Sequence, residues 1–165
     1  MRSVSRITSA NAGQVLRTDG LITAEQLDDV QREAQQTGER VADVLFARGL
    51  VTEHDLAKSM VRQASMPYVS PRTYDIDKDA LAALPAAAAH QHRVLPLDLF
   101  GDILVLATWC ELDPHAVAEM ETDTGKRLAF VIAEKTELET ILNERYPQQD
   151  LGKAVANRLD QLFGG

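Results

Sequence analysis

A stretch of thirteen residues occurs twice in this chain, and this repeat limits the fold more than any other feature. The segment VLRTDGLITAEQL at 15–27 recurs as VLFARGLVTEHDL at 44–56, with seven of the thirteen positions matched when Ile22 is counted with Val51. Self-similarity at a fixed spacing indicates one supersecondary unit used twice, because such a unit cannot bury its apolar face alone. The two copies are therefore expected to pack against each other.

Each copy predicts two short helices with a break between them. Gly20 and Gly49 are placed to end the first helix of each copy, because glycine enters the left-handed conformation after a helix at little cost. Thr23 and Thr52, each with Gln or Asp three residues later, have the spacing of capped helix starts. We therefore expect four short helices in two hairpins over residues 10–65. The residues expected in their shared core are Leu16, Leu27, Leu45 and Leu56.

The pattern changes after residue 66, where short strands alternate with helices. Strands are predicted at 94–100 and 103–107, joined by a two-residue turn at Gly101-Asp102, and a third strand is predicted at 128–132. Helices are predicted at 77–84, 85–92, 113–125 and 136–146, the last capped by Thr136 with Glu139. Residues 66–147 thus predict a small three-stranded α/β layer, and the whole chain belongs to the α+β class.

The two ends of the chain receive separate predictions. Residues 1–9 are expected to be a flexible N-terminus, and residues 148–165 to be an amphipathic C-terminal helix. The apolar stripe of that helix consists of Leu151, Val155, Leu159, Leu162 and Phe163. A short helix of this kind is marginal in water unless its stripe is buried. We expect the stripe to dock on its own domain, on a second copy of the chain as a homo-oligomer, or on a partner.

Composition narrows the function classes. Seventeen basic against 25 acidic residues give a net charge of −8, which argues against a nucleic-acid polymer as partner, because phosphate binding needs a basic surface. The single cysteine, Cys110, cannot form an intramolecular disulfide, and the start MRSVSRITSANAG has no apolar run typical of a signal peptide. The apolar stretches are too short to span a bilayer. We expect a cytoplasmic protein without direct membrane insertion.

Sequence motifs for catalysis are missing. The chain has no G-x-x-x-x-G-K-[ST] phosphate-binding loop, no G-x-G-x-x-G, no C-x-x-C, no H-E-x-x-H and no G-x-S-x-G. His90 and His92 would point to opposite sides of a helix, which is unsuitable for one metal ion. Cys110 and His115 lack a third group that would orient them for catalysis. We expect no enzyme activity, no metal site and no cofactor.

The order of sequence landmarks resembles a known family. The text GLVTEHDLAKSMVRQASMPYV is followed by ALAALPAAAAHQHRVLPL, ILVLAT, LDPHAV and VIAEKTELETILNERY without a large gap. This order over residues 10–147 resembles the MshE-type amino-terminal domain of type II secretion and type IV pilus assembly ATPases, although Cys110-Glu111 stands where the family commonly has Asp-Pro. The resemblance implies a non-catalytic regulatory or docking module. Its implied protein partner is a secretion or pilus ATPase or an inner-membrane platform component.

Some members of this family bind cyclic di-GMP through two tandem copies of a pattern that begins Arg-Leu-Gly and ends in a Leu-x-x-x-Leu-x-x-Gln helix. The second copy in this chain keeps most of the pattern, with Ala42 in place of glycine. The residues that the resemblance implies as ligand contacts in this copy are Arg40, Val41, Leu45, Gly49, Leu50, Leu56, Met60 and Gln63. An arginine fork can pair with a guanine edge or a phosphate, and a glutamine can hydrogen-bond a base.

The first copy departs further from this pattern. Asn11, Ala12, Gln31 and Ala34 replace the arginine, a leucine, the last leucine and the terminal glutamine. The members that remain are Gly13, Leu16, Gly20, Leu21 and Leu27. Helix packing alone would also require these residues. Two interpretations therefore stay open: a cyclic di-GMP sensor that uses the second copy, or a helical core that no longer serves a ligand.

Overall fold

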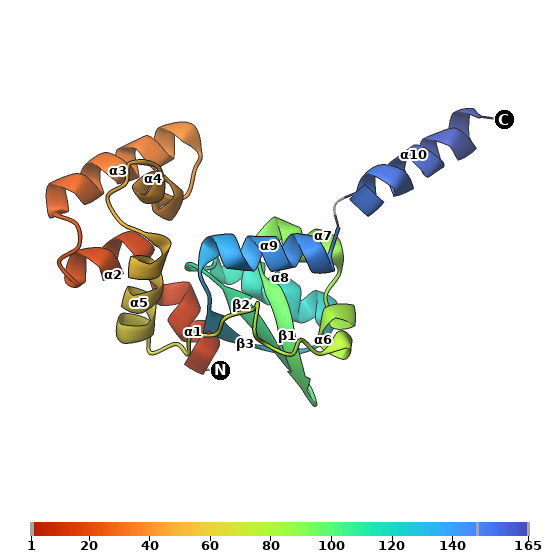
Figure 1. Ribbon diagram of the computed structural model, residues 1–165, viewed down its shortest axis with the longest axis horizontal. Coiled ribbons are helices and arrows are strands. Elements are labelled where there is room, and N and C mark those ends of the chain that lie inside the picture. Colours follow the sequence, from red (N-terminus) through yellow and green to blue (C-terminus); the bar gives the residue numbers. More distant parts are fainter. Residues whose placement is uncertain (1, 148, 165) are drawn as a thin grey trace.

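The structure is a computed structural model that describes residues 2–147 and 149–164. Figure 1 shows a group of short helices, a small sheet with helices packed around it, and a last helix that extends away from both. The elements in chain order are α1 (Arg2–Ser9), α2 (Ala12–Thr18), α3 (Ala24–Thr37), α4 (Val41–Ala47), α5 (Glu53–Ala64), α6 (Lys78–Ala83), α7 (Ala86–His92), β1 (Leu95–Phe100), β2 (Ile103–Thr108), α8 (Pro114–Thr124), β3 (Arg127–Ile132), α9 (Lys135–Arg145) and α10 (Gln149–Phe163). The predicted α+β class is confirmed.

Helices α2 to α5, which we call the helical repeat, are the two copies of the thirteen-residue segment. The Thr23 hydroxyl accepts from the Gln26 backbone N–H at 3.1 Å, and the Gln26 side chain accepts from the Thr23 N–H at 2.9 Å. Thr52 starts α5 with the same capping box. Gly20 and Gly49 follow α2 and α4 with φ of 75° and 68°, in the left-handed region. The predicted starts and stops of these helices are confirmed.

Apolar side chains at equivalent positions of the two copies form the core of the helical repeat. Leu16 and Leu45 are fully buried, and Leu27 and Leu56 are nearly so. All four belong to the same cluster of buried apolar residues, which continues into the sheet. The prediction that they share one core is therefore confirmed.

Residues 2–9 are helical, whereas a flexible N-terminus was predicted. Residues 2–9 form α1, in which Ile7 is fully buried. The Ile7 carbonyl accepts a backbone hydrogen bond from Leu112 at 3.2 Å, and the Arg6 guanidinium donates to the Ser65 carbonyl at 2.8 Å. The segment is amphipathic at helical spacing, but the partners on which it docks lie more than fifty residues away in the sequence.

The sheet has the order β1-β2-β3, with β1 and β2 antiparallel and β2 and β3 parallel. Gly101, with φ of 60°, makes the turn between β1 and β2, as predicted. Helix α8 connects the parallel pair β2 and β3, starting at the Asp113 N-cap and ending before Gly125. The inward sides of the strands supply the buried residues Leu97, Leu104, Leu106 and Phe130. We call β1–β3 with α6–α9 the sheet layer.

Helix α9 begins differently from the prediction that Thr136 and Glu139 would cap it. It begins at Lys135, and its N-cap residue Glu134 makes no side-chain cap. The Thr136 N–H and hydroxyl instead donate to the two oxygens of the Glu53 carboxylate in α5, at 3.0 and 2.6 Å. A carboxylate at a helix N-terminus accepts hydrogen bonds from free N–H groups and interacts favourably with the helix dipole. The cap thus comes from the helical repeat and ties it to the sheet layer.

Helix α10 carries the predicted apolar stripe into solvent. Val155, Leu159, Leu162 and Phe163 are 48% to 83% exposed. The side chain of Leu151, the remaining member of the stripe, lies outside the described residues. Within the described ranges, none of the helices combines the length and the apolar character needed to cross a membrane.

Candidate functional site

The residues implied as ligand contacts fall into two groups in the structure. Most of them are parts of the helical frame. The buried side chains are Leu16, Leu27, Leu45, Leu56 and Met60, and Gly20 and Gly49 occupy the left-handed turns. Gly13 is fixed by packing, because a Cβ at that position would lie 2.4 Å from Leu27 Cδ1. These residues position the helices and present little surface to a ligand.

The second group retains surface for a ligand. Arg40, Val41 and Leu50 are half-buried, whereas Leu21 and Gln63 are exposed. Arg40 and Gln63 are the two polar members, and they line different hollows: Arg40 a cleft toward the sheet layer, and Gln63 a hollow beside Arg6 and Ser65. The structure therefore does not bring the arginine and the glutamine of the second copy into one cavity.

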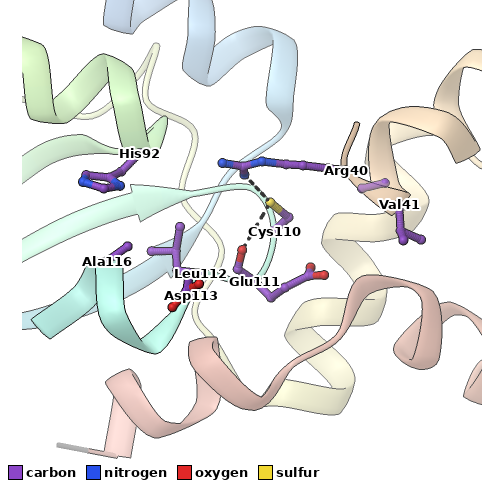
Figure 2. Close-up of a pocket in the computed structure, with 9 residues that line it drawn as sticks. Arg40, Val41, His92, Cys110, Glu111, Leu112, Asp113 and Ala116 are labelled. Carbon is purple, nitrogen blue, oxygen red and sulfur yellow. Dashed lines mark hydrogen bonds between the residues drawn. The ribbon is translucent and has the colours of Figure 1, made fainter. Parts of the chain in front are cut away.

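The Arg40 side chain reaches from the start of α4 to the sheet layer. Its Nη1 atom donates to Cys110 Sγ at 3.0 Å, and its guanidinium carbon lies 5.6 Å from the centre of the Trp109 ring. Figure 2 shows this side chain extending across to the segment after β2. The guanidinium thus has a hydrogen-bond partner and an aromatic partner within the same chain.

The cavity beside this contact, which we call the Arg40 cleft, measures about 290 Å³. Three segments build it: the start of α4, the end of α7, and the segment from the end of β2 into α8 (Figure 2). Its lining residues are Arg40, Val41, Ala42, His92, Cys110, Glu111, Leu112, Asp113 and Ala116. The residues from 110 to 116 were not predicted as site residues. Their one sequence signal was that Cys110-Glu111 departs from the family pattern.

Burial controls the ionisation of the two titratable groups at the centre of the cleft. Burial raises the pKa of the Cys110 thiol to about 12, although the nearby Arg40 opposes the shift. The thiol therefore stays neutral at physiological pH, and a neutral thiol is a poor nucleophile and metal ligand. Burial also raises the pKa of Glu111, against the opposing hydrogen bonds from its own backbone and from the Ala12 N–H. That Ala12 N–H donates to Glu111 Oε2 at 3.1 Å, so the carboxylate sits at the start of α2.

The variant Glu111→Gln is expected to be more stable than the parent protein at neutral pH. Because the folded-state pKa of Glu111 is raised, its contribution to stability is present below its unfolded pKa of about 4.5 and is lost as pH rises through the folded value. The advantage of the glutamine, which can still accept the Ala12 hydrogen bond, should therefore shrink as pH falls toward 4.5. Urea unfolding of both proteins between neutral pH and pH 4.5 measures this difference in the free energy of unfolding. A constant difference at all pH values would show that Glu111 does not titrate as described.

A cluster of charges closes the other side of the contact between the helical repeat and the sheet layer. Asp43 of α4 pairs with Lys135 and lies 3.5 Å from Arg93. The Lys135 ammonium group also lies over the Trp109 ring, 5.2 Å from its centre. A wide groove of about 820 Å³ runs beside this cluster. The cations of this cluster, Arg93 and Lys135, face a carboxylate or an aromatic ring of the same chain. These contacts hold the helical repeat and the sheet layer together.

Gln63 is also engaged within the chain. Its Nε2 atom donates to Asp19 Oδ1 at 2.7 Å, which joins the end of α5 to the turn after α2. The nearby Ser59 hydroxyl and the hydrogen bond from Gln63 lower the pKa of Asp19. Arg62 adds a charge 3.5 Å from the same carboxylate.

The two histidines of α7 have separate surroundings. The His90 ring lies 2.6 Å from the Tyr146 carbonyl, while His92 lines the Arg40 cleft. Among the residues whose placement is described, no group of three or more His, Cys, Asp or Glu could hold a metal ion.

Comparison with known proteins places this arrangement in a family. The MshEN domain family matches residues 64–151, which is more than half of the chain, so the chain belongs to the MshEN domain family. The match covers the end of α5, the sheet layer and the start of α10. The residues of the helical repeat before position 64 lie outside it.

Relatives of known sequence extend the similarity over the helical repeat. The type IV pilus assembly ATPase PilB of Myxococcus xanthus is 25% identical over 141 residues, which cover 86% of this chain and 25% of PilB. Bacteriophage adsorption protein B of Escherichia coli is 28% identical over 137 residues, which cover 83% of this chain and 18% of that protein. The chain thus spans a quarter or less of the length of these curated relatives.

Two solved structures share the fold. A structure of MshE with cyclic di-GMP has a TM-score of 0.68 and 26% sequence identity, and the match covers 82% of this chain and 98% of that one. The N-terminal domain of XpsE has a TM-score of 0.64 and 20% identity, covering 82% of this chain and 93% of that domain. At the lower identity, XpsE supports the fold alone.

Proposed function

We propose that this chain is a non-catalytic regulatory and docking module of a type II secretion or type IV pilus-like system. One observation carries the proposal: the same segment matches less than a third of two relatives with different descriptions, a pilus assembly ATPase and a phage adsorption protein. A module that is shared by such different proteins acts separately from their individual chemistry, since function resides in sites added to a fold.

The chemistry of the Arg40 cleft supports binding over catalysis. The cleft combines a neutral thiol, an arginine with partners in its own chain, and a carboxylate at a helix start. A nucleophile would need a lowered pKa or an adjacent base, and burial shifts the pKa of Cys110 in the opposite direction. The proposed partners are a secretion or pilus ATPase or an inner-membrane platform component, with the exposed stripe of α10 as a docking element.

Removal of α10 tests the docking role. A protein of residues 1–147 is expected to keep the fold, because the described side chains of the stripe are exposed, and to lose self-association or partner binding. Circular dichroism reports the fold, and sedimentation velocity reports association. If the shortened protein unfolds, α10 belongs to the core and the docking proposal fails.

A second candidate function is that of a cyclic di-GMP sensor. Two observations favour it: the similarity to the MshE structure with cyclic di-GMP, and the presence of Arg40 and Gln63 at the pattern positions. Arg40 lines the cleft and donates to Cys110 through Nη1, and its remaining guanidinium N–H groups could pair with a guanine edge or a phosphate. A ligand held in this way would lie at the contact between the helical repeat and the sheet layer, which links the sensor to a regulatory role.

Calorimetry with cyclic di-GMP separates the two candidates. A sensor requires saturable binding that Arg40→Ala abolishes and Arg48→Ala leaves intact. Arg48 is a matched control, because it flanks α4 at the opposite end from Arg40 but pairs with Glu33 on the surface. MgATP is the negative control, because neither candidate function predicts that the protein binds it and gives a heat signal. A flat cyclic di-GMP titration of the parent protein would remove the sensor and leave the docking module.

A further inference from the structure

A second apolar surface lies on α5, distinct from the Arg40 cleft. A hollow of about 390 Å³, which we call the α5 hollow, is lined by His54, Ala57, Lys58, Val61, Arg62 and Tyr68. Its floor is the buried Ala57, and its walls include Val61 and Tyr68, which are 36% and 46% exposed. Apolar side chains gathered around one hollow lower the free energy when another apolar group covers them.

The rim of the α5 hollow is basic, although the chain as a whole carries a net charge of −8. Arg62 lies 3.5 Å from Asp19, and His54 Nδ1 lies 2.7 Å from Glu134. Lys58, by contrast, forms no ion pair within 4 Å among the described residues. The hollow therefore suits an apolar group that arrives together with negative charge.

The end of α10 has this combination. Leu159, Leu162 and Phe163 lie on one side of the helix, and Phe163 is its last residue and 83% exposed. The C-terminal end of a helix carries partial negative charge on its free carbonyls. The last turn of α10 has no basic residue to offset that charge, and it includes Asp160. The most exposed apolar side chains and the negative end of the helix thus occur together.

We propose that the α5 hollow receives the C-terminal end of α10 from a second copy of this chain. Figure 1 shows α10 extending away from the sheet layer, on the side remote from α5, so a second copy supplies the occupant. Contact between two different surfaces closes into a dimer when each copy both provides α10 and receives it, and otherwise forms chains of molecules. The proposal rests on the docking role of α10 and adds the surface that receives it.

Two variants that each remove one side of the contact test this proposal. Val61→Glu places a charge in the hollow, and the double variant Leu159→Glu with Leu162→Glu places charges on the stripe. Sedimentation velocity of the parent protein is expected to show self-association, and each variant alone should weaken it about tenfold or more. An equimolar mixture of the two variants should recover a 1:1 complex, because each lacks the side that the other keeps. Phe100→Glu, at an exposed site on β1, is the control that should leave association unchanged.

The mixing step decides between the proposal and its rivals. If both variants are monomeric and the mixture stays monomeric, the stripe of α10 does not bind the α5 hollow and the proposal is wrong. A parent protein that remains monomeric, or Val61→Glu that associates like the parent, also overturns it. If circular dichroism shows that Val61→Glu is misfolded, Tyr68→Ser replaces it, because this change also removes an apolar side chain from the hollow. Because residues 1–147 lack only α10, self-association that persists in that protein would contradict the docking role itself.

Discussion

Replacing Leu16 or Leu45 by alanine is expected to lower the free energy of unfolding by about 2–5 kcal/mol, the range for removing a buried leucine side chain. The two residues occupy equivalent positions in the two copies of the repeat, and both are fully buried. Each variant would leave a cavity between the four helices as well as losing apolar burial. Urea unfolding followed by circular dichroism measures the loss.

Leu21→Ala is the matched control for these two variants. Leu21 belongs to the same ligand pattern as Leu16, but it is 44% exposed and is expected to cost less than about 1 kcal/mol. Equal losses at Leu16 and Leu21 would contradict the division of the pattern into a buried frame and an exposed remainder. Comparing Leu16→Ala with Leu21→Ala therefore distinguishes a pattern residue that packs in the core from one that lies on the surface.

The helical repeat could be predicted closely from the sequence because its signals are local. Gly20 and Gly49 stop helices through a conformation that glycine adopts easily, and Thr23 and Thr52 cap helices through atoms three residues away. The turn at Gly101 was predictable for the same reason. In each case the residue and its partner are neighbours in the chain.

The features that sequence could not predict depend on distant partners. Helix α1 docks through Ile7 and Arg6 onto residues far along the chain. The start of α9 is capped by Glu53 of α5 in place of the local capping pair. Periodicity can show that a segment has an apolar face, as it does for α1, but it does not show which distant residues that segment contacts.

The candidate site shows the same limit. Arg40 was found because it matches a family pattern, but its contact with Cys110 joins residues seventy positions apart. The pattern also placed Arg40 and Gln63 in one ligand site, whereas they line separate hollows. A sequence pattern fixes spacing along a helix, and the direction in which each side chain points depends on what the helix packs against.

Trp109 lies at the contact between the helical repeat and the sheet layer. It is almost completely buried in the segment after β2. Three side chains surround its ring: Phe46 at 5.9 Å between ring centres, Arg40 at 5.6 Å and Lys135 at 5.2 Å. Phe46 belongs to α4, Arg40 comes immediately before α4, and Lys135 is the first residue of α9. The indole thus contacts both parts of the molecule at once, and cations over its face add to the packing.

Trp109→Ala is therefore expected to lower the free energy of unfolding by about 3–5 kcal/mol, as for other buried aromatic residues. Trp109→Phe should cost clearly less, because it keeps an aromatic ring for Phe46 and the cations. It also removes an indole N–H that is buried without a hydrogen-bond partner among the described residues. Circular dichroism is the suitable probe, since either change removes the one tryptophan of the chain.

Hydrogen exchange would show where the stability is lost. If Trp109 joins the two parts, its removal should raise exchange in α4 and α5 more than in β2 and β3, because the sheet keeps its own hydrogen-bonded ladder. Equal acceleration in all four elements would mean that Trp109 supports a single cooperative core. A loss below about 1 kcal/mol for Trp109→Ala, well under the usual cost of removing a buried aromatic ring, would contradict its role at this contact.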